Sequence, residues 1–383
     1  MFEVPPVVLV LGGDDALDQL PFVQCLSPIV THKELMAKVA AVLGVTAKDM
    51  ASMKLPDMYE VPISYLKYLK EVVCEMFLMT NEVKGGASQF VEIAGPDDSL
   101  TDLHENLQFF VKQGAHRFFI PTESRISFVN AYTEQVLTTL GGGDEISTEE
   151  RMEATSAAMD AVSSELVDHG FNERSVKLAN QAIKSLAKFA KENTSSKIFK
   201  LLSTFLKSKM SYRFKRVQLT MMLVNHAIKN MDWGANEHIE KLSYVAFFHD
   251  ILLYKDELAR IQSDEELDES DLSEKDKRIV RHHALWTLDL LKDYPETHMG
   301  ATVLIKQHHG AINGIGFSEN PGSNISPLAI VFMVCESYAC EVLEATEADR
   351  EVDHKAILNL LLKKYPRQQY QKVIKALKSL AMS

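Results

Sequence analysis

The chain has 383 residues, 46% of them hydrophobic and 25% charged, and 53 acidic against 41 basic residues give a net charge of −12. This composition excludes a disordered or fibrous chain and provides enough apolar material for the cores of two or three globular domains. The acidic balance argues against broad binding to nucleic acid or to an anionic membrane, although it leaves room for a local basic pocket that holds phosphates.

The cysteines and the N-terminal sequence bear on the compartment. Cys25, Cys74, Cys335 and Cys340 form no CxxC pair, which is typical of reduced thiols in a cytosolic protein. Glu3 stands where a signal peptide needs a basic region, and no segment approaches the roughly 20 apolar residues of a membrane span. We therefore expect a cytoplasmic protein without membrane insertion.

Residues 1–50 begin with a predicted buried strand at 7–11, followed by a Gly-Gly-Asp-Asp turn. Residues 33–43 carry a helical apolar period. The segment resembles a receiver domain reduced to its first strand and last helix. No phosphoacceptor aspartate can be assigned in it.

Residues 51–140 have the pattern of a small α/β module. Short strands are predicted at 61–64, 74–79, 89–93 and 116–121. A helix predicted over 100–113 ends at Gly114, a usual helix stop. The glycines at 141–143 form the clearest linker in the chain.

From residue 146 to the end, the apolar period is helical almost throughout. Ser147 is the predicted N-cap of the first helix, with acidic residues in its first turn. Helices are predicted at 152–169, 173–193, 196–209, 214–231, 237–253, 275–291, 298–308, 327–344, 355–365 and 370–380. The acidic stretch 264–274 is predicted to be a solvated loop near the mouth of a site. The expected fold class is mainly α, a helical bundle preceded by a small α/β domain.

Histidines and one aspartate recur in this helical region in an order that suits a metal site. The pair His249-Asp250 is carried by an apolar helical run, His283 follows, and the pair His308-His309 comes last. Mixed nitrogen and oxygen ligands of this kind suit Zn, Fe, Mn or Ni. Neutral imidazoles bind the ion, and an aspartate oxygen can bridge to a second one.

The segment 212–345 resembles the HD-GYP proteins, metal-dependent phosphodiesterases that hydrolyse the bacterial messenger cyclic di-GMP. That family carries, in order, His, His-Asp, His, His-His-Glu with Asp-Gly-x-Gly-Tyr-Pro, and Asp. The matching residues here are Arg216, His249-Asp250, His283, His308-His309-Gly310, Asn313-Gly-Ile-Gly-Phe-Ser318 and Glu336. The resemblance implies an HD-type helical bundle over 146–383. It also implies that 51–140 is the small α/β module that often precedes such a bundle, with a task in sensing or interaction.

The resemblance further implies a divalent transition metal, Fe, Mn, Zn or Ni, and a role for each matched residue. The expected metal ligands are His249, Asp250, His283, His308, His309 and Glu336. Asp250 and Lys255 are expected to serve catalysis. Arg216, Asn313 and Phe317 are expected to contact the nucleotide, cyclic di-GMP or its linear product.

Arg216 is the departure with the largest consequence, because it stands where the family has its first metal histidine; a different local register would put Arg213 there. A guanidinium stays protonated and cannot ligate. The family's last aspartate is Glu336, which is one methylene longer. Since both changes fall in the same half of a two-metal site, they indicate a salt bridge in place of one metal. The alternative is that Arg216 swings to solvent and the site weakens.

Three smaller departures accompany these. The family's Lys after His-Asp is Leu253 here, with Lys255 nearby but shifted, the Glu after His-His is Gly310, and the Tyr-Pro pair is Phe317-Ser318.

Two functions stay open: a cyclic di-GMP phosphodiesterase of weak activity with one well-held metal, or a catalytically inactive receptor or scaffold. The protein partners that the resemblance suggests are GGDEF-domain and other signalling proteins.

Overall fold

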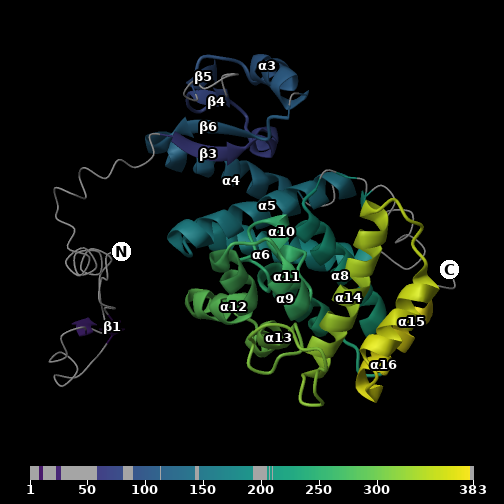
Figure 1. Cartoon of the computed structure of the whole chain (residues 1–383). Coiled ribbons are helices and arrows are strands. Elements are labelled where there is room, and N and C mark those ends of the chain that lie inside the picture. The colour runs from purple at the N-terminus through teal and green to yellow at the C-terminus, as the bar shows by residue number, and fades with distance from the viewer. Residues whose placement is uncertain are drawn as a thin grey trace. The chain divides into compact units, whose positions relative to one another are not determined.

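The computed structural model describes residues 8–11, 23–26, 58–80, 89–112, 114–142, 146–192, 205–206, 208 and 210–379 (Figure 1). Backbone contacts divide the chain into two compact units. The first comprises Met1–Pro62 and Cys74–Arg125, and the second comprises Ile63–Val73 and Ile126–Ser383. The second unit thus includes 126–140, which the sequence places with the α/β module. The division into 1–50, 51–140 and 146–383 stays a prediction.

The first unit contains two small sheets. Strands β1 (Val8–Leu11) and β2 (Val23–Leu26) pair in parallel. An antiparallel sheet of order β3-β6-β4-β5 is built from β3 (Met58–Pro62), β4 (Met76–Thr80), β5 (Gln89–Ala94) and β6 (Arg117–Pro121), and α3 (Leu100–Lys112) lies between β5 and β6 in the chain. The predicted strands and helix are confirmed here with shifted bounds. The helix predicted at 33–43 lies outside the described residues.

The second unit is helical. Its elements are η1 (Ile63–Tyr68), α4 (Arg125–Gly141), α5 (Thr148–His169), α6 (Glu173–Glu192), α8 (Tyr212–Lys229), α9 (Asn236–Phe248), α10 (Asp256–Ala259), α11 (Asp264–Glu269), α12 (Glu274–Leu290), η4 (Leu291–Asp293), α13 (Ala301–Gln307), α14 (Pro327–Glu347), α15 (His354–Lys364) and α16 (Gln368–Leu377). The mainly α fold class, with a small α/β part near the N-terminus, is therefore confirmed.

Helix α8 is the centre of this bundle. It packs against α6, α9, α14 and α16, and nearly every one of its side chains is buried. A helix that is covered on all sides has no amphipathic stripe, and its polar residues must find partners inside the protein. Arg213 and Arg216 lie on this helix, so both guanidinium groups are held in the interior.

The ends of two predicted segments differ from the structure. Helix α9 stops at Phe248 instead of 253, because the amides of Ile251 and Leu253 bond to the carbonyls three residues earlier, Phe248 and Asp250. The pair His249-Asp250 is therefore at the end of the helix and not within it. The stretch 264–274, predicted as a loop, begins with α11, whose N-cap Ser263 accepts a hydrogen bond from the Glu266 amide. Acidic residues in a first turn stabilise such a helix.

Helix α4 is absent from the predicted elements, although its sequence carries a signal for it. Phe128, Tyr132, Val136 and Leu140 recur every four residues and are all buried. The predicted N-cap Ser147 is confirmed: it forms a capping box with Glu150 at the start of α5. The helix predicted at 196–209 lies almost wholly outside the described residues.

Within the described part of the chain, no helix combines the length and the apolar character needed to span a membrane.

Gly234, in the turn between α8 and α9, is a position where an added side chain is expected to destabilise the protein. A Cβ added at Gly234 would overlap the backbone carbonyl of Ile228. We expect Gly234→Ala to destabilise the protein by about 1–3 kcal/mol, the range of overpacking changes, measured as the urea midpoint of unfolding. Gly322→Ala is the matched control, since its added Cβ has no neighbour closer than 3.9 Å. Equal midpoints for both variants would contradict the role of this turn.

Candidate metal centre

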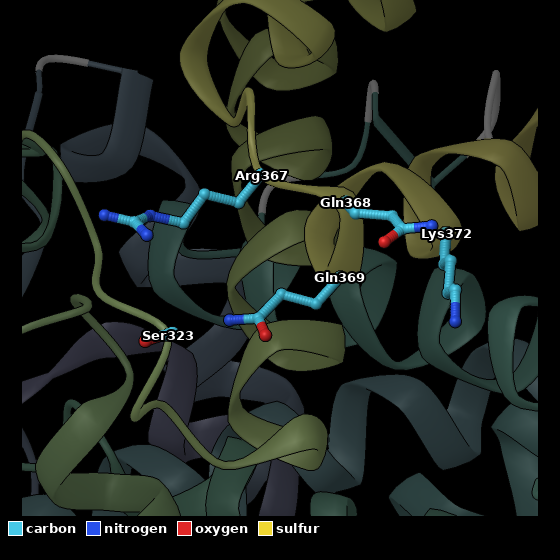
Figure 2. A pocket seen from close by; sticks show the side chains of 5 residues that line it. All are labelled: Ser323, Arg367, Gln368, Gln369 and Lys372. Carbon is cyan, nitrogen blue, oxygen red and sulfur yellow. The ribbon is translucent and has the colours of Figure 1, made fainter.

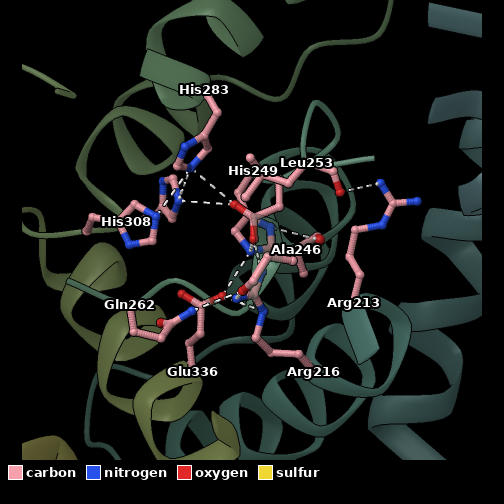
Figure 3. A network of polar contacts seen from close by, with 12 residues as sticks. Arg213, Arg216, Ala246, His249, Leu253, Gln262, His283, His308 and Glu336 are labelled. Carbon is pink, nitrogen blue, oxygen red and sulfur yellow. Dashed lines mark hydrogen bonds and ion pairs between the residues drawn. The ribbon is translucent and has the colours of Figure 1, made fainter. Parts of the chain in front are cut away.

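The predicted metal ligands and Arg216 come together in the interior of the helical unit (Figure 3). His249 is the C-cap residue of α9, Asp250 follows in the turn, and His283 lies on α12. His308 caps α13 and is followed by His309, while Glu336 lies on α14 and Arg216 on α8. All are buried except His309, which is half-buried.

Three imidazoles and one carboxylate converge on one point. The Nε2 atom of His283 lies 3.1 Å from Nε2 of His308 and 3.2 Å from Nε2 of His309. Oδ1 of Asp250 lies 3.2 Å from Nε2 of His283 and 3.5 Å from Nε2 of His308. All four ligand atoms lie within 4.8 Å of one another. This is a complete set of mixed N/O ligands for one divalent transition metal.

The protonation of these groups fits a cation. Nδ1 of His283 lies 2.6 Å from the Val280 carbonyl and Nδ1 of His308 lies 2.6 Å from the Ile305 carbonyl. A carbonyl can only accept, so each Nδ1 carries the proton and each Nε2 keeps its lone pair for the centre. Burial and the neighbouring His308 lower the pKa of His283 to about 3, and burial lowers the pKa of His308 as well.

The Asp250 carboxylate faces the Nε2 lone pairs of these imidazoles, and this arrangement requires a positive charge between them. Its Oδ1 is buried and has no hydrogen-bond partner. A buried carboxylate oxygen facing lone pairs of neutral imidazoles is unfavourable without a positive charge between them. Burial also lowers the pKa of His309 well below its usual value, so this imidazole is neutral too. The residues therefore fit a metal ion held by Asp250, His283, His308 and His309.

A second group of potential ligands consists of His249, Asp250 and Glu336. The side chain of Arg216 contacts both carboxylates of this group. The guanidinium of Arg216 forms an ion pair with Oδ2 of Asp250, its Nε lies 3.6 Å from Oε1 of Glu336, and NH1 donates to the carbonyl of Ala259. Arg216 is 1% exposed, so the alternative that it swings to solvent is wrong.

His249 belongs to this second group and has an acceptor at each ring nitrogen. Its Nε2 lies 2.9 Å from Oε1 of Glu336, its Nδ1 lies 3.0 Å from the Ala246 carbonyl, and burial lowers its pKa to about 4. A neutral imidazole carries one proton, so it donates to one of these acceptors only. Burial opposes the ionisation of Glu336, but His249 and Arg216 outweigh it and lower the pKa of Glu336 to about 2.

The structure also shows which of the two arginines of α8, Arg213 or Arg216, lies at the centre. Arg213 points to α5, where NH2 lies 3.0 Å from Oδ1 of Asp160 and NH1 lies 3.0 Å from Oγ of Ser163. Arg216, three residues later on the same helix, is the residue that reaches the centre. Arg216 is therefore the arginine that contacts the predicted ligands Asp250 and Glu336.

The other predicted residues differ in how close they lie to the centre. The ring of Phe317 is half-buried, with its centroid 4.3 Å from that of His309. The exposed Asn313 accepts a hydrogen bond from the Ile315 amide, which shapes its own loop. Lys255 is exposed and lies over the Tyr254 ring, 5.3 Å from its centroid. Of the three, Phe317 alone has a described contact with a metal ligand, and the catalytic and binding roles stay predictions.

Two contacts at the site were not expected from the sequence. The backbone carbonyl of Ala259 accepts from Arg216, and no side-chain pattern could have revealed a carbonyl. Oδ2 of Asp264 accepts from the Phe317 amide at 3.3 Å, which fixes the start of α11 on the glycine-rich loop. This contact brings the start of the acidic stretch to Phe317, while its position at the mouth of the site stays a prediction.

Gly310 explains one departure from the family pattern. Its φ of +74° lies in the left-handed region. An added Cβ would lie 2.8 Å from Cγ of Pro321 and 3.0 Å from Cε of Met333. The glutamate that the family carries after His-His therefore cannot be accommodated in this loop as it stands.

Comparisons with known proteins give a match in fold and none in sequence family. No protein-family model matches the sequence, and no curated protein matches it. Among solved structures, the chain is similar to Bd1817, a HDG"Y"P protein from Bdellovibrio bacteriovorus, with a TM-score of 0.51 and 15% sequence identity over 84% of this chain and 100% of that chain. At this identity the likeness shows the fold. The chain thus has the predicted HD-GYP-like fold, and its buried His/Asp group has the composition and spacing of metal ligands.

The lowered histidine pKa values predict how metal-free protein responds to pH. In the unfolded chain these histidines titrate near 6.5, whereas the folded values are about 4 for His249 and about 3 for His283. The unfolded state therefore binds more protons below pH 6.5, and stability present above that pH is lost as the pH falls toward the folded values. We expect a loss of up to about 1.4 kcal/mol per pH unit for each such histidine.

Urea midpoints of EDTA-treated protein at pH 7, 6 and 5 measure this effect. The range lies above the folded pKa of Glu336, about 2. His283→Gln should flatten the dependence, while His104→Gln, which changes an exposed histidine on α3, should leave it unchanged. A midpoint independent of pH in the native sequence would contradict neutral, buried imidazoles at the centre.

Proposed function

We propose that the chain is a divergent HD-GYP protein that holds one divalent transition metal and binds cyclic di-GMP or its linear product beside it. The ligands of the metal are Asp250, His283, His308 and His309. The observation that supports this most directly is the position of Arg216, whose guanidinium contacts both Asp250 and Glu336. A fixed side-chain cation takes the place that a second metal ion would need.

The chemistry follows from this replacement. A bound divalent ion supplies a Lewis acid for a phosphoryl oxygen. Hydrolysis by a two-metal centre requires ions roughly 3.5–4 Å apart, on the attacking and leaving sides of the phosphorus. Arg216 supplies positive charge but no coordination position, and Nε2 of His249 faces Glu336 at 2.9 Å. Hydrolysis of cyclic di-GMP is therefore weak or absent in this proposal.

The second candidate function is a catalytically inactive receptor or scaffold. Burial of the centre favours it, since His283 is 1% exposed and Asp250 and His308 are each 2% exposed. Of the four metal ligands, His309 is the half-buried one, and the ring of Phe317 beside it is half-buried as well. Binding without turnover suits such a site, and GGDEF-domain or other signalling proteins stay predicted partners.

The metal content separates one-metal from two-metal centres. We expect one metal ion per chain after anaerobic purification, with the metal content measured by elemental mass spectrometry. Arg216→His should raise the content toward two and increase hydrolysis of cyclic di-GMP in Mn²⁺ or Fe²⁺, since it exchanges the guanidinium for a ligand. Arg213→His is the matched control, because it removes a buried arginine of the same helix that pairs with Asp160. Two metals per chain in the native sequence would refute the proposal.

Phe317 tests the binding of the nucleotide. Stacking of a base on an aromatic ring contributes about 1–3 kcal/mol, so Phe317→Ala should weaken binding of cyclic di-GMP to metal-loaded protein by about tenfold, measured by calorimetry. Asp264→Asn keeps the acceptor for the Phe317 amide but removes a negative charge beside it, so it should strengthen binding. Phe109→Ala, on α3, is the control. No heat with the native sequence at high micromolar nucleotide would leave the scaffold function alone.

A further inference from the structure

The turn that carries Asp250 is held by side chains from two other helices. The hydroxyl oxygen of Ser163, on α5, lies 2.6 Å from the carbonyl oxygen of Ile251, the residue after Asp250. NH1 of Arg213, on α8, lies 3.4 Å from the carbonyl oxygen of Leu253, which follows in the same segment (Figure 3). Both carbonyls lie beyond the last residue of α9, where buried backbone groups need partners from elsewhere.

Ser163 has a partner on each side of its hydroxyl group. The residue is 2% exposed, and NH1 of Arg213 donates to its Oγ at 3.0 Å. Because a carbonyl can only accept, the hydroxyl donates its own hydrogen to Ile251. NH2 of Arg213 pairs with Oδ1 of Asp160 at 3.0 Å. A chain of bonds therefore runs from Asp160 through Arg213 and Ser163 to the turn, and each bond polarises the next.

A surface cavity of the same unit contrasts with this chain of bonds (Figure 2). It has a volume of about 340 Å³ and is lined by Ser323, Arg367, Gln368, Gln369 and Lys372. Lys372 and Gln368 extend away from Arg367 and Gln369, so the polar groups of the cavity do not converge on one point. Ser163 and Arg213 are, in contrast, buried and paired with each other.

The bond from Ser163 bears on the direction of the Asp250 carboxylate. Oδ1 of Asp250 lies 3.2 Å from Nε2 of His283, while Oδ2 pairs with Arg216. Each oxygen keeps its partner only while the backbone of the turn stays in place, and Ser163 fixes the carbonyl of the residue that follows Asp250. Outer partners that orient a ligand in this way raise metal affinity by about 10- to 100-fold.

We propose that Ser163 is a positioning residue for Asp250 and holds it in the direction that a bound metal requires; this role rests on the metal centre of the proposed function. Helix α5 precedes the segment 212–345 that resembles the HD-GYP proteins, so the support of the centre extends beyond that segment. A single serine on a helix leaves no pattern in the sequence, and its role becomes visible only through the contact with the turn.

Binding of Co²⁺ tests the role of Ser163. This ion lies between Fe²⁺ and Ni²⁺ in its affinity for such ligands, and its visible absorption depends on the number and arrangement of the ligands. Co²⁺ is titrated into the full chain, after EDTA treatment and dialysis, in the native sequence, in Ser163→Ala and in Ser185→Ala. The last variant is the matched control, because it removes a buried hydroxyl of α6 whose partner is Thr155.

We expect Ser163→Ala to bind Co²⁺ about tenfold or more weakly than the native sequence, and Ser185→Ala to differ from it by less than about twofold. The absorption spectrum should change in Ser163→Ala alone, which a general loss of stability would not produce. Equal affinities and spectra in Ser163→Ala and the native sequence, or equal losses in both variants, overturn the role of Ser163 alone. No binding of Co²⁺ by the native sequence at millimolar concentration overturns the proposed metal centre together with it.

Discussion

The two oxygens of Asp250 face two different groups, and the arrangement of the turn that carries them follows from this division. Oδ1 faces the neutral imidazoles of His283 and His308, while Oδ2 pairs with Arg216. A carboxylate that is 2% exposed is strongly unfavourable without a positive charge, which Arg216 supplies. Helix α9 therefore has to end before this residue, so that a turn can direct one oxygen toward α12 and α13 and the other toward α8.

Arg216 connects the centre to the surrounding structure as well as balancing its charge. Its third contact, with the Ala259 carbonyl, extends from the centre to α10, and α11 follows a few residues later with Asp264 on the Phe317 amide. A metal ion could not make these directional hydrogen bonds, because the guanidinium alone presents several N–H donors in fixed directions. Arg216 therefore attaches the centre rigidly to α10.

The sequence predicted the helical fold and the histidine set well, because both leave periodic or ordered signals. It placed Arg216 at the centre and left Arg213 as the alternative, because the two are three residues apart on a fully buried helix. That choice depends on which acid each reaches, Asp160 on α5 or Asp250, and these pairings exist only after packing. The end of α9 was missed for a similar reason: the apolar period continues to Leu253, whereas turn hydrogen bonds stop the helix at Phe248.

The left-handed backbone at Gly310 has a consequence for how this sequence can change over time. Pro321 and Met333 occupy the space that a side chain at 310 would need. An acidic residue at 310 would need more room at both of these positions and a different backbone conformation. Because the three residues share one space, the effects of changing them on stability are expected to be non-additive. A change of chemistry at the centre that needs a side chain after the histidine pair therefore requires several substitutions at once.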